Sequence, residues 1–349
     1  MNESITPGSS GTTGEIVVIG GGTGLSVMLR GLKKRTDRIA AVVAVSDDGG
    51  GSGKLRNDMG ILPPGDIRNC IMALSNTEPI MSSLLTYRFT EGELKGQCFG
   101  NLFIAALNRI TGSFYQAVRY MSDVLAITGR VLPVTVEDVH IEAEFGNGVS
   151  VRGESKILRY KKMFDSPIKS IRMIPEKPKA LDDTIDAIEN ARMIVFGPGS
   201  LYTSVIPNLL VDGIVDAIER SRAKKVYVCN VMTQDGETEK YTAFDHVKAV
   251  FEHSGEGIFD TCIVNNMAVS GTLAERYAKE GAESIDIDRE RFREAGIKLI
   301  ELPLLDENTN LARHDPDKLA GALMDVLEGD LNGYDLFGEN QGRAVQNTY

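Results

Sequence analysis

Glycine-rich stretches carry the groups in this chain that are best suited to binding an anion. The first, GGGTGLS from Gly20 to Ser26, precedes residues with helical spacing, so its backbone N–H groups and the helix dipole can together stabilise a phosphate. It does not complete the G-x-G-x-x-G fingerprint, because Leu25 stands at the third glycine position, and it lacks the G-K-[ST] ending of a P-loop. A tight turn that permits close helix packing is the alternative interpretation.

Two later stretches add donors and acceptors of the same kind. In GPGSLYTS, Gly197 and Gly199 permit a sharp turn, and Ser200 is placed to cap the next helix while free N–H groups face a phosphate. In NVMTQDGET, the polar groups of Asn230 and Thr233 suit a base or a sugar, although an ordinary polar turn explains them equally well.

The loop SDDGGGSGKLRNDMGILPPGDIRN is longer than usual strand-to-helix connections, so we expect it to line a ligand cleft. Asp47 and Asp48 follow an apolar run, where a dinucleotide fold places the acid that binds ribose; a metal ion and a solvated turn are the alternatives. Asp66 can cap the helix that follows or face the cleft, while Arg68 or Asn69 reaches elsewhere from its first turn.

Strands that alternate with helices are expected to position these stretches. The predicted strands are residues 16–19, 39–45, 193–200, 226–232, 261–266 and 297–303. Right-handed crossovers between such strands give an α/β fold with a doubly wound, mostly parallel, Rossmann-like sheet, whose ligand lies beyond the carboxyl ends of the strands. Because the polar stretches follow these strands, we expect them to meet at one site.

The domain organisation follows from composition and from a change of pattern. Residues 1–14 and 329–349 are rich in Gly, Ser, Asn and Asp and are predicted to be tails, which leaves a single α/β domain over residues 15–328. Short, partly alternating segments at about 131–175, with an Asn-Gly hairpin turn, predict a small antiparallel β insertion.

Charge and composition exclude several classes of function. A formal net charge of -11 argues against binding to nucleic acid or to an anionic membrane surface. No apolar run is long enough to cross a bilayer and the first residues lack a signal-peptide pattern, so we expect a cytoplasmic protein without membrane insertion. The four cysteines form no CxxC pair and the four histidines lack metal-ligand spacing, so neither a zinc site nor a disulfide framework is predicted.

Several long motifs, in order from about residue 15 to residue 327, resemble the gluconeogenesis factor family, the YvcK-like branch of the CofD-like (UPF0052) group. They are IVVIGGGTGLSVMLRGLK, AVSDDGGGSGKLR, LPPGDIRNCIMALS, FGNLFIAAL, FGPGSLYTSVIPNLL, NVMTQDGETEKYTAFDHV and RHDPDKLA. Relatives commonly read GGSSGRLR where this chain has GGGSGKLR, so Lys54 is left out of the predicted site.

The resemblance implies a bacterial regulatory protein needed for growth and cell shape on gluconeogenic carbon sources. It implies binding of UDP-sugars, notably UDP-N-acetylglucosamine, with no cofactor required. It also implies a homodimer and an unknown protein partner in cell-wall or carbon metabolism.

Two further residues match family positions tied to this ligand. By this similarity, Tyr277 in ERYAKEGA would pack on the uracil or sugar, and Arg313 in ARHDP would bond to the diphosphate. The founding enzymes of the group are 2-phospho-L-lactate transferases that use Mg²⁺, and in them an aspartate matching Asp66 contacts the acceptor. The alternative function is therefore such a transferase, with Asp47 or Asp48 holding magnesium. An NAD-dependent oxidoreductase is disfavoured by the incomplete fingerprint.

The predicted site is a ligand-binding site, with no catalytic residue assigned and any metal left open. Its residues are Gly20, Gly21, Gly22, Thr23, Gly24, Asp47, Asp48, Asp66, Arg68, Asn69, Asn101, Gly197, Gly199, Ser200, Asn230, Thr233, Tyr277 and Arg313.

Overall fold

A computed structural model describes residues 14–330 and 335–336 of the 349-residue chain. The predicted tails, 1–14 and 329–349, lie for the most part outside the described residues. The centre of the fold is an eight-stranded sheet in which seven strands are parallel and β11 pairs antiparallel at one edge. In spatial order the strands are β11 (Asp335–Leu336), β10 (Lys298–Leu302), β9 (Thr261–Asn265), β8 (Lys224–Val228), β7 (Met193–Phe196), β1 (Ile16–Gly20), β2 (Ile39–Val43) and β3 (Arg130–Pro133).

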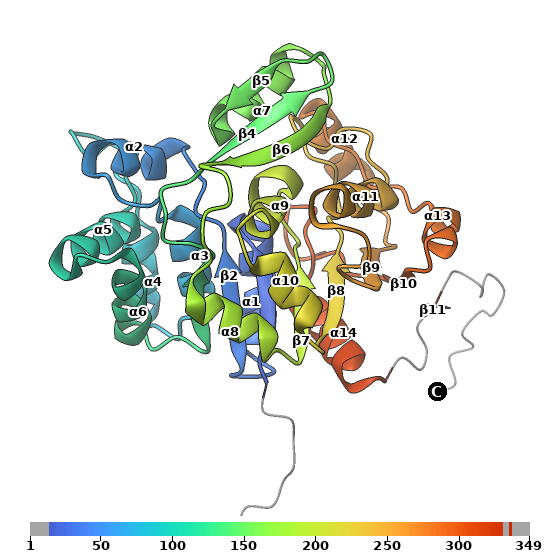
Figure 1. Ribbon diagram of the computed structural model, residues 1–349, viewed down its shortest axis with the longest axis horizontal. Coiled ribbons are helices and arrows are strands. Elements are labelled where there is room, and N and C mark those ends of the chain that lie inside the picture. The colour runs from blue at the N-terminus through green and yellow to red at the C-terminus, as the bar shows by residue number, and fades with distance from the viewer. Residues whose placement is uncertain (1–13, 331–334, 337–349) are drawn as a thin grey trace, which may run out of the picture.

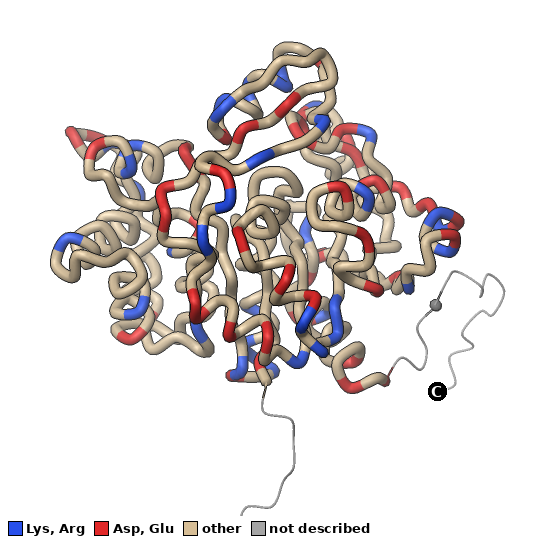
Figure 2. The backbone as a smooth tube through the Cα atoms, in the orientation of Figure 1, with Lys and Arg blue, Asp and Glu red and all other residues tan. Residues whose placement is uncertain are grey.

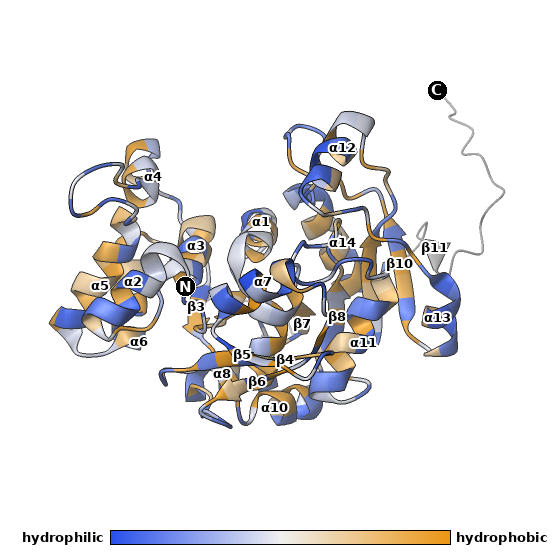
Figure 3. Cartoon of the chain, turned by 90° about the horizontal axis from the view of Figure 1, so that it is seen from above, coloured by the Kyte–Doolittle hydropathy of each residue, from blue (hydrophilic) through white to orange (hydrophobic). Residues whose placement is uncertain are grey.

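Helices cover both faces of this sheet. Figure 3 shows α1, α3 and α14 on one side of the strands and α8, α10 and α11 on the other. The helices are α1 (Gly22–Leu32), α2 (Gly50–Met59), α3 (Gly65–Leu74), α4 (Pro79–Thr86), α5 (Phe99–Thr111), α6 (Phe114–Val124), α7 (Glu154–Met163), α8 (Asp182–Glu189), the π-helical turn η1 (Leu201–Val205), α9 (Ile206–Leu209), α10 (Ile214–Arg220), α11 (Ala243–Ser254), α12 (Gly271–Lys279), α13 (Arg289–Glu294) and α14 (Pro316–Glu328). This arrangement confirms the predicted α/β class.

The sequence of the central strands explains their place between two helical layers. β1 reads IVVIG and β2 reads IAAVV, and every residue in both strands is buried. Such continuous apolar runs are typical of parallel strands that are covered on both faces, whereas a strand with one wet face alternates. Because these strands are buried, the polar loops that follow them begin at the strand ends, where the chain leaves the sheet.

The strand order contains one switch point, between β1 and β7. From β1 the chain moves outward in one direction through β2 to β3, and from β7 it moves in the other direction through β8 and β9 to β10. The loops that follow β1 and β7 therefore lead to helices on opposite faces of the sheet, and doubly wound sheets bind ligands at such a switch point.

The antiparallel insertion is a three-stranded sheet in the order β5, β4, β6, with α7 between β5 and β6. Its strands are β4 (His140–Phe145), β5 (Ser150–Arg152) and β6 (Ile168–Ile174). In Figure 1 it lies above the main sheet. The predicted start at residue 131 is wrong, because residues 130–133 form β3, which pairs parallel with β2 in the main sheet.

Charge is distributed without a long segment of one sign. Figure 2 shows Lys and Arg interspersed with Asp and Glu along the described part of the chain. Among the same residues, no helix combines the length and apolarity needed to span a bilayer.

Candidate functional site

The strand register brings the predicted turns to one edge of the sheet. Gly20 pairs with Val43 of β2, and Ile19 pairs with Phe196 of β7. Phe196 in turn pairs with Tyr227 of β8. The turns that follow therefore leave the sheet at the same level, around the switch point. We call this edge the rim, defined as residues 20–24, 44–48, 197–200 and 228–230.

The first glycine turn enters α1 without a side-chain cap. Gly22 has a φ of +67°, which glycine adopts without steric cost, and Gly21 at the N-cap makes no side-chain bond. The first N–H groups of a helix have no partner within it, so the amides of Thr23 and Gly24 lie at the rim beside the positive end of an 11-residue helix. This turn has the donors that a phosphate requires.

The two glycine turns pack against one another. A Cβ atom on Gly24 would lie only 2.6 Å from the Pro198 carbonyl oxygen, so no larger residue fits there without displacement of the second turn. Asn208, which is buried in α9, donates from Nδ2 to the Gly20 carbonyl oxygen at 3.1 Å. The turns after β1 and β7 therefore form one continuous surface.

Side chains from the segment after β8 hold the second turn. The Asn230 amide accepts a bond from the Gly199 N–H at 3.0 Å and donates to the Gly199 carbonyl oxygen at 2.9 Å. The Ser200 hydroxyl donates to Gln234 Oε1 at 2.8 Å and makes no capping bond, so its predicted N-cap role is wrong. Asn230 and Ser200 thus already have protein partners, and their contact with a ligand stays a prediction.

Glu237 takes the place that the sequence analysis gave to a phosphate at the second turn. Its Oε1 accepts bonds from the N–H groups of Tyr202 and Thr203, each at 3.0 Å. The predicted free amides are therefore not free. A buried carboxylate of the chain satisfies them, since Glu237 is 1% exposed.

Asp66 lies beside the first turn and does not cap its helix. α3 begins at Gly65, so Asp66 is the second helical residue and its predicted N-cap role is wrong. Its carboxylate accepts a bond from the Gly22 amide, and a Cβ on Gly21 would lie 2.6 Å from Asp66 Oδ2. Burial, followed by the negative charge of Asp47, raises the pKa of Asp66 to about 6.

Asp47 and Asp48, at the rim, accept hydrogen bonds from the backbone amides of neighbouring segments. Asp47 Oδ1 accepts the Gly49 amide at 2.7 Å, and Asp48 Oδ1 accepts the Ser155 amide at 2.8 Å, which ties the first turn of α7 to the rim. Burial raises the pKa of Asp47, and it raises the pKa of the neighbouring Glu154 well above its ordinary value. In both groups burial disfavours the charged form of the carboxyl.

Arg68, Asn69 and Asn101 form a polar group between α3 and α5. Arg68 donates to Cys98 Sγ and, at 2.5 Å, to Asn69 Oδ1. A Cβ on Gly100 would lie 2.8 Å from Arg68 Cδ, so the start of α5 packs on this arginine. The adjacent Asn101 is buried, and its Oδ1 has no hydrogen-bond partner among the described residues. An unsatisfied buried acceptor marks a position for an external donor.

A pocket of about 680 Å³ adjoins the second turn through Gln234. The Tyr277 hydroxyl accepts the Ala312 amide at 3.2 Å, and the Thr233 hydroxyl accepts the Glu283 amide at 2.9 Å. Tyr277 and Thr233 therefore support the walls of the pocket as well as facing it. The pocket is lined by Lys162, Thr233, Gln234, Asp235, Tyr277, Lys279, Glu280, Gly281 and Ala282.

The predicted residues fall into three groups. One surrounds the glycine turns, and the second, Arg68, Asn69 and Asn101, lies at α3 and the start of α5. The third lies by α12, where exposed Arg313 follows the Ala312 that bonds to Tyr277. The sequence analysis missed Asn208 and Glu237. A signal existed for Asn208, a polar residue within the apolar segment SVIPNLL, but none existed for Glu237, which lies in the polar segment QDGETEK.

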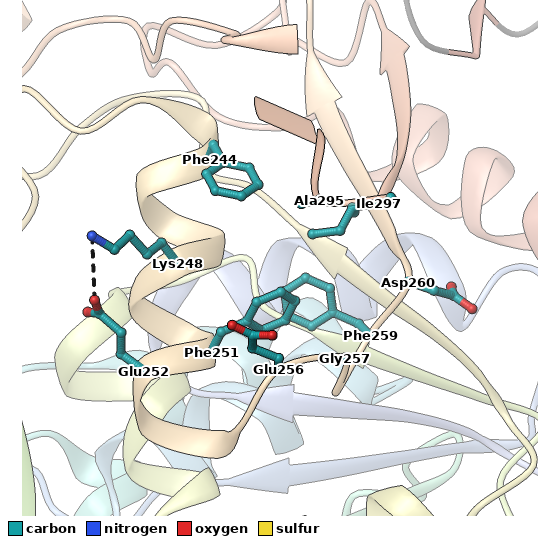
Figure 4. Close-up of a pocket in the computed structure, with 11 residues that line it drawn as sticks. Phe244, Lys248, Phe251, Glu252, Glu256, Gly257, Phe259, Asp260, Ala295 and Ile297 are labelled. Carbon is teal, nitrogen blue, oxygen red and sulfur yellow. Dashed lines mark ion pairs between the residues drawn. The ribbon is translucent and has the colours of Figure 1, made fainter. Parts of the chain in front are cut away.

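A further pocket, of about 750 Å³, lies between α11 and the start of β10 (Figure 4). Phe244, Phe251 and Phe259 give it an apolar lining, and Lys248 pairs with Glu252 at 3.6 Å on its margin. It contains none of the predicted site residues, so we do not assign it to the candidate site.

No metal centre is evident. Across the described ranges, no group of three or more His, Cys, Asp or Glu side chains has an arrangement that could hold a metal ion. Magnesium at Asp47 or Asp48 stays a prediction.

Comparisons with known proteins identify the family. The sequence profile of 2-phospho-L-lactate transferase CofD matches residues 16–305. The chain is 46% identical to the gluconeogenesis factor of Bacillus subtilis, over 90% of this chain and 98% of that protein. It is 54% identical to a provisionally named gluconeogenesis factor of Thermoanaerobacterium thermosulfurigenes, over 90% and 97% of the two chains. A crystal structure of a UPF0052 family member from Bacillus halodurans matches with a TM-score of 0.86 at 44% identity, covering 89% of this chain and 100% of that one. The chain therefore belongs to the CofD/UPF0052 family, within its gluconeogenesis factor group.

Proposed function

We propose that this protein is a regulatory member of the gluconeogenesis factor group that binds UDP-sugars, notably UDP-N-acetylglucosamine. The observation that carries the proposal is the start of α1 at the switch point of the sheet, where Asp66 accepts the Gly22 amide and no side chain caps the next two amides. There the amides of Thr23 and Gly24 offer a diphosphate directed donors and the positive end of a helix dipole.

The pocket beside α12 supplies space for the remainder of such a ligand. It joins the rim through Gln234, which bonds to Ser200 and lines the pocket. Tyr277 and Thr233 add an aromatic ring and a hydroxyl to its walls, and these groups suit a uracil or a sugar. We assign the phosphates to the first turn and the nucleoside or sugar to this pocket.

The cellular part of the proposal extends the family resemblance. We place the protein in the cytoplasm, as a homodimer, with a protein partner in cell-wall or carbon metabolism and a role in cell shape on gluconeogenic carbon sources. In this role the ligand-bound form would be the form that the partner recognises.

A second candidate function is a CofD-type transferase that acts on a nucleotide-activated donor with Mg²⁺. Two observations favour it: the match to the CofD profile over residues 16–305, and the raised pKa of Asp66 beside the first turn. A carboxyl group that titrates near pH 6 is suited to exchanging a proton with an acceptor hydroxyl.

Titration calorimetry with UDP-N-acetylglucosamine, GDP and NAD tests the binding proposal. We expect heat from the UDP-sugar, and affinity that falls at least tenfold in Tyr277→Ala and in Arg313→Ala. Equal or tighter binding of GDP or NAD would overturn the assignment of ligand.

Prolonged incubation of the protein with UDP-N-acetylglucosamine and Mg²⁺ separates the two candidate functions. We expect the nucleotide-sugar to be recovered intact by chromatography. Release of UMP or UDP that disappears in Asp66→Asn would favour the transferase.

A further inference from the structure

The second glycine turn holds an arrangement of amides that ordinarily binds phosphate. η1 and α9 form one continuous helical segment, and successive N–H groups at its start, from Tyr202 and Thr203, converge on a single point. The Leu201 backbone and the Thr203 hydroxyl also face this point. Consecutive amides at a helix start form an anion-binding nest. In this chain, Glu237 Oε1 lies at its centre.

The carboxylate reaches this nest from inside the protein. Glu237 is 1% exposed and belongs to the segment after β8 that also provides Asn230 and Gln234. Asn230 binds both backbone groups of Gly199, and Gln234 accepts the Ser200 hydroxyl. Three side chains of one segment are therefore hydrogen-bonded to consecutive parts of the second turn. We call Asn230, Gln234 and Glu237 the clamp.

The clamp contains one ionisable side chain, the carboxyl group of Glu237, which is buried. Glu237 Oε2 is buried and has no hydrogen-bond partner among the described residues, and burial raises the pKa of Glu237 to about 7 against the lowering effect of the turn amides. The ionisable groups that interact electrostatically with it come from several elements, namely Glu154 of α7, Tyr202 of η1, Tyr227 of β8 and Tyr241 before α11. Glu237 therefore changes charge near neutral pH.

We propose that Glu237 is a positioning residue for the nucleotide-sugar site, because its carboxylate fills the amide nest of the second turn, fixes that turn at the rim and confines the ligand's phosphates to the first turn. The predicted effect of Glu237 on ligand binding rests on the proposed function. The predicted effect of Glu237 on the conformation of the second turn does not rest on it.

Ionisation of Glu237 predicts how the affinity for the nucleotide-sugar changes with pH. The diphosphate of a UDP-sugar is fully ionised throughout the neutral range, so the ligand does not contribute to the change. Above pH 7 the ionised Glu237 repels the phosphates at the adjoining first turn, and below pH 7 its protonation removes that repulsion. Glu237→Gln keeps an acceptor for the amides but has no charge at any pH.

Calorimetry of UDP-N-acetylglucosamine binding at pH 6 and pH 8 tests this step. We expect Glu237→Gln to bind about 3-fold more tightly than the unchanged protein at pH 8 and equally well at pH 6, which corresponds to about 0.7 kcal/mol at pH 8. Asp66 titrates in both proteins, so its contribution cancels in the ratio. A ratio that is the same at both pH values would overturn the proposal, because a purely structural role gives no pH dependence.

Hydrogen exchange by mass spectrometry tests the clamp without a ligand. We expect Glu237→Ala to speed exchange of the amides of residues 199–204 at least tenfold, while Glu237→Gln keeps most of their protection. Glu189→Gln is the matched control, because it changes the same group at the surface, where Glu189 pairs with Arg220 at 2.6 Å.

The two measurements separate the two proposals. If the unchanged protein does not bind UDP-N-acetylglucosamine but exchange responds as expected, the ligand assignment fails and the positioning role stands. Unchanged protection of residues 199–204 in Glu237→Ala, or loss of that protection in Glu237→Gln, would overturn the positioning role whatever the binding result.

Discussion

Single residues at the rim determine how closely its turns pack and which backbone amides have partners. Glycines in the first turn let the backbone of the second turn approach, and Asp66 accepts the Gly22 amide while Thr23 and Gly24 retain theirs. Packing therefore explains the glycines at Gly21 and Gly24, and a role of the first turn in ligand binding stays a prediction.

Gly24→Ala is expected to destabilise the protein by about 2 kcal/mol, because its new Cβ would lie 2.6 Å from the Pro198 carbonyl oxygen. Urea unfolding measures the change. Gly321→Ala is the matched control, since Gly321 lies inside α14 and a methyl group added there would have nothing within 4 Å, and we expect it to stabilise by about 0.5–1 kcal/mol. Equal effects of the two substitutions would contradict the close packing of the turns.

Asp66→Asn is expected to stabilise the protein at pH 7 and to have little effect at pH 4. Because the pKa of Asp66 is raised from 3.8 to about 6 in the folded state, folding favours the protonated form, and the cost of ionisation grows as pH rises through that window. The gain at pH 7 should be about 1–3 kcal/mol in the free energy of unfolding. Unfolding curves across this pH range, with exposed Asp37→Asn as control, provide the measurement. A gain that is constant with pH would show that the pKa of Asp66 is not raised in the folded state.

At the scale of residues, the sequence predicts features that depend on residues close together in the chain. The position of the first turn follows from a strand, three glycines and a helical pattern that lie next to one another in the chain. Glu237 could not be assigned in the same way, because its partners Tyr202 and Thr203 lie more than thirty residues away and meet it only after the sheet has formed.

At the level of elements, the rim is firmly supported, whereas the adjoining pocket beside α12 is lightly supported. The turns rest on strands of the main core, whereas α12 has no buried residue and stands on a small separate cluster. That cluster comprises Val231, Met232, Leu305 and Ala312, with Met267, Val269, Leu273 and Tyr277 packed against it. Few buried apolar contacts mean that α12 opens at lower cost than the sheet.

Hydrogen exchange should therefore be faster in α12 than in α1, and Leu273→Ala should speed it further by weakening the small cluster. Saturating UDP-N-acetylglucosamine should slow exchange in α12 if the pocket beside Tyr277 receives part of the ligand. Protection of α12 equal to that of β1 in the free protein would contradict its loose attachment.

The antiparallel insertion shows why element boundaries were harder to predict than element types. VLPVTV reads as a β segment in either sheet, and only its pairing with β2 assigns residues 130–133 to the main one. The β pattern of this segment depends on its own residues, but the choice of the strand that it pairs with depends on residues far away in the chain. The helix after Thr242 was predictable because its cap is local, and the structure shows the full capping box with Asp245.

At the scale of the whole molecule, alternation of strands and helices was sufficient to predict a doubly wound sheet. The position of β7 beside β1 was not predictable, because strand order depends on crossover connections that the sequence does not encode locally. That order creates the switch point on which the binding proposal depends. The net charge of -11 favours an isolated, locally stabilised phosphate site over a broad anion-binding surface.

The most direct test of the account places a second carboxylate at the start of α1, where Asp66 already accepts the Gly22 amide. Thr23 is exposed in the first turn of that helix, so Thr23→Asp should keep or slightly raise thermal stability through its interaction with the helix dipole. The same charge should repel a bound diphosphate, and Thr23→Ser serves as the neutral control. Calorimetry with UDP-N-acetylglucosamine should then show one site per chain in the unchanged protein and in Thr23→Ser, and at least tenfold weaker binding in Thr23→Asp. Undiminished binding by a folded Thr23→Asp protein would contradict the claim that the start of α1 holds the phosphates.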